Sequence, residues 1–345
     1  MEISNYNSRK IAILNMFAIM LVLLIHSYYV EAADFPVSNS IQLITGTYGM
    51  AGVAVPLFFF ISGLLFFKSI SSVNDCISGI KRRVRTLFIP YMIWNMVFVG
   101  YYILLSVLPG LSQFSNSEVI NHLSLSHPIS TLGYLFLEPV AFHLWFLRDL
   151  MLFVIVTPIL WASLKSYPWG TLIALLLFGI ISGSGIVYFA FGAFISLSCG
   201  IDVFSKFLSK PIVYISLLIF VVSSIMTAIP VCTTIVMNNA FRQFVNFSGI
   251  FAVWGLFDIL YRCELHKKLD KCIIISKYSF FIYLFHEPVF NIIKKVNMII
   301  FGANECSLVI LYFINPILMV LISIFVAMSL KIILPRIYSI AVGGR

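Results

Sequence analysis

Two histidines lie inside long apolar segments of this 345-residue chain. His26 falls near the end of the run from Ile11 to Val30, and His286 falls in the run from Tyr278 to Phe290. A polar group at such depth in a bilayer costs several kcal/mol unless it faces protein, a partner group or a water-filled cavity. A neutral imidazole can also take a proton from a hydroxyl, as a general base for acyl transfer must. We therefore predict that both histidines belong to a site, with an interhelical hydrogen bond as the alternative for His26.

Other polar residues accompany His286 in the same segment. An ionised Glu287 cannot face lipid without a partner. Pro288 has no N–H to bond the carbonyl of Leu284, so it is expected to kink the helix. Tyr283 lies one turn before His286. We predict that these side chains border a polar cavity, and a structural kink with a capped carboxyl is the alternative.

A second polar cluster, EPVAFHLWFLRDL, begins another apolar segment and contains His143. Trp145 can serve as an interfacial belt residue or as a stacking surface for a sugar ring. Arg148 and Asp149 are consecutive, so they diverge by about 100° on a helix and need not pair with each other. The charge of Arg148 cannot face lipid, so we expect it to have a protein or ligand partner.

Ser62 and Gly63 interrupt a strongly apolar segment, VPLFFFISGLLFF. Small residues allow two helix backbones to approach closely, so helix packing is the first interpretation. The alternative is a nucleophilic Ser62 with His26 as its base, although spacing in the sequence cannot show contact between helices.

Three arginines, Arg82, Arg83 and Arg85, stand directly before an apolar segment. Such a cluster is mainly an anchor on the cytoplasmic side of a membrane. Its functional interpretation is a phosphate clamp for a nucleotide-bearing acyl donor, because guanidinium groups bind phosphates bidentately. By contrast, no Cys and His spacing typical of a metal site is present, and no metal is expected.

The composition excludes an ordinary soluble domain, since 61% of the residues are hydrophobic, 10% are charged and the mean hydropathy is +1.04. A bilayer core needs about 20 apolar residues per helix. Ten apolar segments are found, at roughly 11–30, 48–67, 87–108, 142–163, 169–182, 186–199, 211–230, 243–260, 278–293 and 307–330. We predict an all-α polytopic integral membrane protein of about ten transmembrane helices. It would form a single transmembrane domain over residues 1–345, with its core at about 9–335.

The basic residues are distributed unequally between the two sides of these segments. If the N-terminus is cytoplasmic, 18 of the 22 lysines and arginines fall in cytoplasmic loops or ends, and the exceptions are Arg148, Arg242, Lys294 and Lys295. This bias predicts ten spans with both termini in the cytoplasm. Contact with anionic membrane lipid accounts for the net charge of +9, so no nucleic acid partner is needed.

Together these motifs resemble acyltransferase family 3, the membrane O-acyltransferases that include bacterial polysaccharide O-acetylases. The resemblance rests on the order and spacing of His26, FFFISG at 58–63, RRVR at 82–85 with Pro90 and Tyr91, HLWFL at 143–147 and SFFIYLFHEPV at 279–289. It covers nearly the whole chain.

The resemblance implies transfer of an acyl group, usually acetyl, from acetyl-CoA to a hydroxyl of a cell-surface polysaccharide or lipid-linked sugar. It places the protein in a bacterial plasma membrane and implies acyl-CoA as a donor substrate, with no bound cofactor. His26 matches the family's essential histidine, as general base or transient acyl carrier, and the arginines match sites for coenzyme A phosphates. The other candidates would shape the acceptor side: Ser62, His143, Trp145, Arg148, Tyr283, His286 and Glu287.

One position departs from the family pattern, because Asn15 stands where the family commonly has a basic residue. This departure bears on how the donor is handled and leaves the expected fold unchanged. A transporter or flippase of lipid-linked glycan is the rival function, since it too would use intramembrane charges and helices broken by proline. A non-catalytic membrane subunit is a third possibility.

Overall fold

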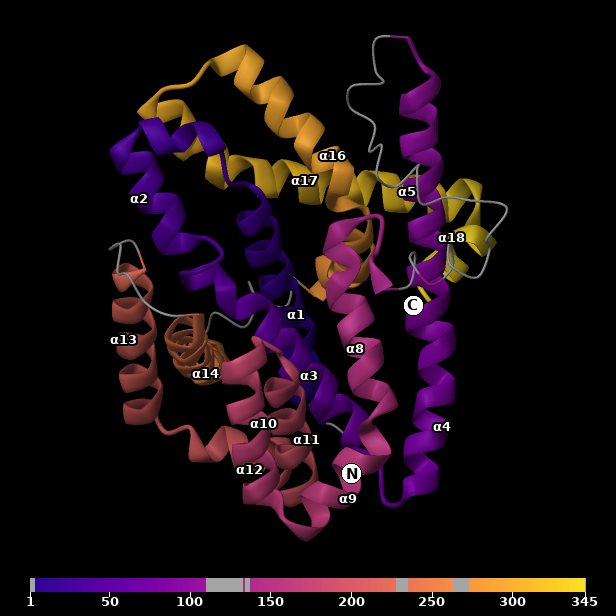
Figure 1. Cartoon of the computed structure of the whole chain (residues 1–345), viewed down its shortest axis with the longest axis vertical. Coiled ribbons are helices and arrows are strands. Elements are labelled where there is room, and N and C mark those ends of the chain that lie inside the picture. Colours follow the sequence, from indigo (N-terminus) through magenta and orange to yellow (C-terminus); the bar gives the residue numbers. More distant parts are fainter. Residues whose placement is uncertain (1–3, 110–132, 134–136, 228–234, 263–272, 345) are drawn as a thin grey trace. The chain divides into compact units, whose positions relative to one another are not determined.

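The computed structural model describes residues 4–109, 133, 137–227, 235–262 and 273–344. This part of the chain is mainly helical and contains no strand, which confirms the predicted all-α class (Figure 1). In chain order the elements are α1 (Asn5–His26), η1 (Val30–Asp34), α2 (Pro36–Thr45), η2 (Met50–Val53), α3 (Ala54–Phe67), α4 (Val73–Arg83), η3 (Val84–Phe88), α5 (Ile89–Val107), η5 (Phe142–Leu144), α8 (Trp145–Ile155), α9 (Thr157–Ser166), α10 (Pro168–Ser182), α11 (Ile186–Ser198), α12 (Gly200–Phe207), α13 (Lys210–Met226), α14 (Ile235–Leu260), α16 (Ser279–Phe301), α17 (Glu305–Ile333) and α18 (Pro335–Ala341).

Each of the ten predicted apolar segments contains at least one helix among its described residues. Among the described residues, five helical stretches are long and apolar enough to cross a membrane, and seven if each of two bent pairs is one span. The bent pairs are α8 with α9 and α11 with α12, whereas α10 and α13 are shorter apolar helices. Ten spans and cytoplasmic termini therefore stay predictions. Four basic residues used for that topology, Lys267, Lys268, Lys271 and Arg345, lie outside the described part.

Large apolar side chains are exposed on several of these helices. Ile159, Leu218 and Phe325 are each more than 60% exposed. Such side chains are stable on a surface that faces lipid rather than water. With the candidate spans, they identify the chain as a multi-pass membrane protein.

The chain divides into two compact units. The first unit comprises Met1–Asp75 and Pro158–Val326, and the second comprises Cys76–Thr157 and Ala327–Arg345. The predicted single domain includes both units. His26 and His286 belong to the first, and the arginine-rich segment at 82–85 belongs to the second.

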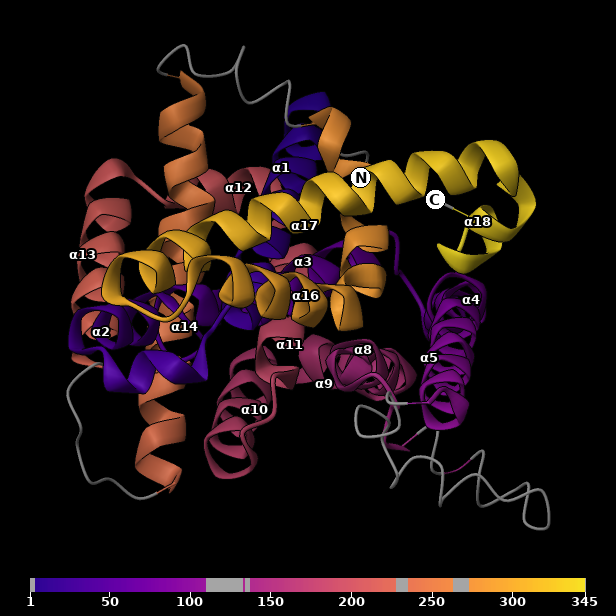
Figure 2. The ribbon, with the colours of Figure 1, turned by 90° about the horizontal axis from the view of Figure 1, so that it is seen from above.

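Helices α3 and α11 form a close backbone contact in the first unit (Figures 1 and 2). A Cβ atom at Gly63 would collide with the carbonyl oxygen of Phe189, and one at Gly192 would collide with the carbonyl oxygen of Phe60. Glycine on both helices therefore allows an approach that any side chain would prevent. The packing role predicted for the Ser62–Gly63 pair is confirmed.

The beginning of α1 is held by a buried ion pair in the same unit. The Nζ atom of Lys10, whose residue is 0% exposed, lies 2.8 and 2.7 Å from the two carboxylate oxygens of Asp258 on α14. The same ammonium lies 4.2 Å from the centre of the Trp254 ring. A buried charge requires such partners, so this pair fixes α1 against α14.

We predict that Gly63→Ala destabilises the protein by about 1–3 kcal/mol, because the added methyl group meets backbone rather than a flexible side chain. The measurement is thermal unfolding of the purified protein in detergent. Gly100→Ala on α5 is the matched control, since a Cβ there meets nothing within 4 Å. Equal unfolding temperatures for the two variants would contradict the proposed contact.

Candidate active site

His26 is the last residue of α1, and the next residue anchors that end of the helix. Ser27 is fully buried, and its hydroxyl donates a 2.7 Å hydrogen bond to the carbonyl oxygen of Tyr312 on α17. Its backbone N–H bonds the carbonyl of Leu24. The histidine therefore stands on a helix end that a neighbouring helix fixes in place.

Lys294 of α16 binds two backbone carbonyl groups at this end of α1. Its Nζ atom donates hydrogen bonds to the carbonyl oxygens of His26, at 3.0 Å, and Tyr28, at 2.9 Å. The last carbonyls of a helix have no partner within the helix, and a cation there also interacts favourably with the helix dipole. Lys294 thus links the backbone at His26 to α16, the helix that also carries His286 and Glu287.

Helix α16 is broken at the point where it faces His26. Glu287 has non-helical backbone angles, φ −94° and ψ 142°, and Pro288 follows it. Proline disfavours the helical conformation of the residue before it and cannot donate a backbone hydrogen bond. The predicted kink is confirmed, and both His286 and Glu287 are buried as expected, at 0% and 6% exposure.

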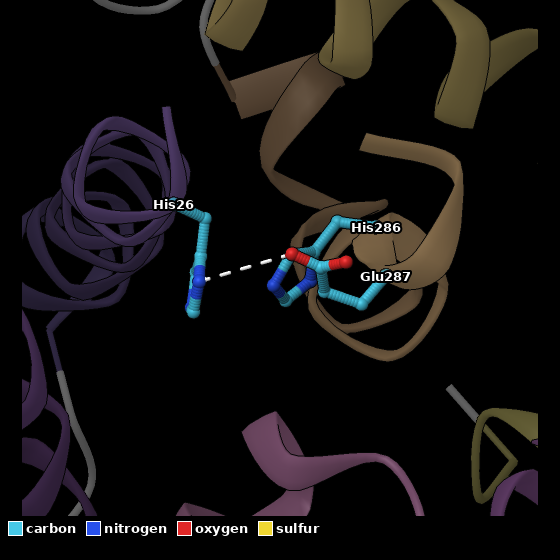
Figure 3. Close-up of side chains that lie close together, drawn as sticks. All are labelled: His26, His286 and Glu287. Carbon is cyan, nitrogen blue, oxygen red and sulfur yellow. Dashed lines mark ion pairs between the residues drawn. The ribbon is translucent and has the colours of Figure 1, made fainter. Parts of the chain in front are cut away.

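The side chains of His26, His286 and Glu287 meet between α1 and α16 (Figure 3). The Nδ1 atom of His26 lies 3.9 Å from Oε1 of Glu287, and the two imidazole ring centres are 5.1 Å apart. Asn291, one turn further along α16, donates a 2.6 Å hydrogen bond to the other carboxylate oxygen, Oε2. One carboxylate oxygen of Glu287 is therefore held by Asn291, and the other faces His26.

The tautomer of a neutral His286 follows from its neighbour. Its Nδ1 atom lies 2.7 Å from the carbonyl oxygen of Tyr283, which can only accept. Nδ1 must then carry the proton, and Nε2 is the acceptor nitrogen of a neutral ring. Tyr283, a predicted site residue, contributes this carbonyl, and its ring centre is 6.2 Å from that of His286.

The cluster has the components of an oriented base. A carboxylate beside one nitrogen of an imidazole fixes the ring and stabilises the imidazolium form, while the other nitrogen can act on a substrate. The structure also permits a second use, because His26, His286 and Glu287 each offer one potential metal ligand atom and these atoms lie within 4.8 Å of one another. Two imidazoles and a carboxylate are a ligand set found in catalytic zinc sites.

Ser62 lies on α3 and is half-buried beside the contact with α11. Its side chain makes no hydrogen bond with any residue that the structure describes. The pairing that the structure gives His26 is with a carboxylate on α16, which favours packing as the role of Ser62.

Three other predicted site residues, His143, Trp145 and Arg148, lie in the second unit. His143 is buried, with its ring edge against Phe98 at a centroid distance of 5.6 Å, and Trp145 is 38% exposed. Arg148 has the protein partners expected of it, the carbonyl of Leu137 and the carboxylate of Asp149, 2.8 Å away. Adjacent residues thus pair although their positions on the helix diverge, because the long arginine side chain can turn back to its neighbour.

Arg82 and Arg83 end α4, and Arg85 lies in the π-helix η3 that follows. Arg82 and Arg85 are exposed, whereas Arg83 is half-buried. Single π-helical turns within longer helices are frequent at functional sites. The arrangement leaves these guanidinium groups available for a ligand within the second unit.

Two residues of the His26 site, Asn291 and Lys294, were not predicted from the sequence. In the sequence, Lys294 stands out only as one of the four basic residues that fall outside the predicted cytoplasmic loops and ends. A signal was present, because Asn291 and Lys294 follow Glu287 by four and seven residues, the spacing that places side chains on one helix face.

The chain is similar to known proteins over most of its length. The family model described as an acyltransferase domain, of the acyltransferase 3 type, matches residues 11–334. The succinoglycan biosynthesis protein ExoH of Rhizobium meliloti (strain 1021) is 28% identical over 250 residues, which cover 69% of this chain. The match spans 65% of that relative's own length, slightly less than two thirds. No solved structure matches the chain.

We predict that Lys294→Met loosens the end of α1, because two carbonyl groups lose a charged donor. Hydrogen bonds to charged groups contribute about 1.5–3 kcal/mol, so amide hydrogen exchange in the last turn of α1 should accelerate about 10- to 100-fold. Hydrogen exchange measured by mass spectrometry tests this, with Lys295→Met as the control at the exposed neighbouring lysine. Unchanged exchange near His26 would show that Lys294 does not hold this helix end.

Proposed function

Because the chain belongs to the acyltransferase 3 family, we propose that it is a membrane O-acyltransferase of a bacterial plasma membrane. It moves an acyl group, acetyl in our proposal, from acyl-CoA to a hydroxyl of a cell-surface polysaccharide or lipid-linked sugar. The name of the relative, a succinoglycan biosynthesis protein, supports a glycan as the acceptor.

The observation that carries this proposal is the opposition of His26 and Glu287 across α1 and α16. Closing the distance from 3.9 Å by about 1 Å gives a normal hydrogen bond, and catalytic hydrogen bonds often tighten when substrate binds. Asn291 holds the carboxylate for this contact. The site therefore has a base, a group that orients the base, and a residue that orients the carboxylate.

In the proposed reaction, Nε2 of His26 accepts the proton of the acceptor hydroxyl as its oxygen attacks the thioester carbon. Glu287 stabilises the imidazolium through Nδ1. The carbon–sulfur bond then breaks, and the thiolate of coenzyme A takes the proton from His26. The products are an ester on the sugar and free coenzyme A, and the enzyme returns to its starting protonation state.

A transient acyl group on His26 is the alternative within the same function. The position of Glu287 favours the general base, since a carboxylate beside the imidazole stabilises the imidazolium form without requiring a covalent step. The metal-like spacing of the three side chains is a second alternative. We favour metal-free chemistry because Lys294 is a cation two turns from Glu287 on α16, and like charge opposes a bound metal ion.

Roles for the remaining candidates follow as proposals. Arg82, Arg83 and Arg85 bind the phosphates of acyl-CoA. His286 and Tyr283 contact the acceptor near His26, and His143, Trp145 and Arg148 serve acceptor binding.

We predict that His26→Ala lowers the rate of acyl transfer by about 10²–10⁴-fold, the usual contribution of a general base. Glu287→Gln should lower the maximal rate by about 10²-fold or more, because the amide cannot stabilise the imidazolium. The assay uses protein in nanodiscs with radiolabelled acetyl-CoA and lipid-linked glycan from the host. Release of coenzyme A and label in the lipid fraction are both measured.

Ser62→Ala is the control for the rival nucleophile, and a chelator is the control for a metal. Both should leave the rate nearly unchanged. Loss of transfer in Ser62→Ala with activity retained in His26→Ala would replace the proposed base with a serine mechanism. Label trapped on wild-type protein but absent from His26→Ala would favour the acyl carrier. A well-folded protein that neither binds nor consumes acetyl-CoA would leave the flippase as the better function.

We predict that replacing Arg82 or Arg85 by Gln raises the KM for acetyl-CoA about tenfold and changes kcat little, because each lost phosphate contact weakens binding of the donor in all states alike. Steady-state kinetics with varied acetyl-CoA tests this. Lys81→Gln, at the exposed lysine beside the cluster, is the matched control. A fall in kcat with unchanged KM would argue against a phosphate clamp.

A further inference from the structure

A second polar site lies at the beginning of α1, in the same unit as His26. A cavity of about 470 Å³ there is lined by Tyr6, Asn7, Asp202, Ser205, Lys206, Asp258 and Arg262. Its volume is in the range of small-ligand sites. These residues come from the first turn of α1, from α12, from α14 and from Arg262 just after α14, and none of them takes part in the proposed reaction.

Two of the lining residues, Asp258 and Ser205, already have hydrogen-bond partners within the protein. Asp258 accepts hydrogen bonds from Lys10 and from the Tyr6 hydroxyl. Ser205 accepts from Lys10, at 3.3 Å, and from the indole N–H of Trp254, at 3.0 Å. The charges of Lys10 and Asp258 cancel, so neither demands a ligand.

Asn7 is different, because one of its polar atoms has no partner. It is 2% exposed, and its amide nitrogen donates a 2.6 Å hydrogen bond to Asp202. This bond identifies the other atom as the carbonyl oxygen Oδ1, which has no hydrogen-bond partner among the described residues. A buried amide oxygen without a donor is costly, so a ligand group that donates a hydrogen bond to it would stabilise the site.

The rim of the cavity carries charges of both signs. Asp202, Lys206 and Arg262 are all exposed. Two cations suit a phosphate group, and the Asp202 carboxylate, which accepts a hydrogen bond from the amide nitrogen of Asn7, suits an ammonium group. The matching ligand therefore combines a phosphate with an N–H-bearing amine.

The position of the cavity narrows the choice of ligand. α1 begins at Asn5 and α14 ends at Leu260, and both supply candidate membrane spans. The ends of transmembrane helices lie at the level of the lipid headgroups, where basic side chains bind lipid phosphates.

We propose that this cavity binds the headgroup of an aminophospholipid, phosphatidylethanolamine. The ammonium group donates to Oδ1 of Asn7 and to Asp202, and the phosphate contacts Lys206 and Arg262. Phosphatidylcholine has the same phosphate and charge but no N–H, and phosphatidylglycerol has no amine. The bound lipid would secure the first turn of α1, the helix whose other end carries His26.

The test is native mass spectrometry of the full chain, purified in detergent and mixed with equal amounts of the three lipids with identical acyl chains. We expect the wild type to retain phosphatidylethanolamine about tenfold more than phosphatidylcholine, the difference made by charged hydrogen bonds. Asn7→Ala should bring this ratio close to one. Because the ratio is measured within one protein sample, partial unfolding of a variant does not imitate the effect.

Two further variants separate the contacts. Arg262→Gln should lower retention of both lipids and leave their ratio above one, since the phosphate is common to them. Arg242→Gln, at the opposite end of α14, should change neither quantity. Equal retention of the two lipids by the wild type, or an unchanged ratio in Asn7→Ala, would overturn the proposal. Displacement of the lipid by acetyl-CoA would also overturn it and assign the cavity to the nucleotide.

Discussion

A polar group among apolar helices must find its partners inside the protein, and this constraint governs both ends of α1. At one end, Lys10 is fully buried and paired with Asp258. At the other end, His26 faces Glu287, and Lys294 binds the last carbonyl groups. An unpaired charge at either place would cost several kcal/mol. The same interactions that make α1 stable therefore fix where its histidine stands.

The break in α16 is the local consequence of one proline, and it creates the opposing half of the site. Pro288 prevents a regular helix, so Glu287 takes extended backbone angles and its carboxylate leaves the helical pattern. The helix resumes at once, which brings Asn291 back to that carboxylate and Lys294 to the end of α1. A kink that could have been only structural thus supplies an oriented acid beside an imidazole.

The helical class could be predicted because it follows from composition, and each of the ten apolar segments is helical. The number of spans was less certain for a physical reason. Hydropathy records how apolar a segment is but not whether it bends, and α11 with α12 is bent by 106°. Within the described parts of the chain, five to seven stretches pass the length and composition test, where ten were predicted for the whole sequence. The Gly63 contact was foreseeable, since glycine in an apolar helix is typical of close packing.

The sequence by itself determined that the chain is a helical membrane protein, that it resembles acyltransferase family 3 and that His286 and Glu287 lie inside. These conclusions depend on residue type and local spacing. Only the tertiary structure decided that Glu287 faces His26, about 260 positions earlier in the chain. The same holds for Lys294, which binds the backbone carbonyl at the end of α1. Charge counting treats every lysine alike, so it could not separate the buried Lys10 from a loop residue. Partners between distant helices depend on how those helices pack, which no local pattern encodes.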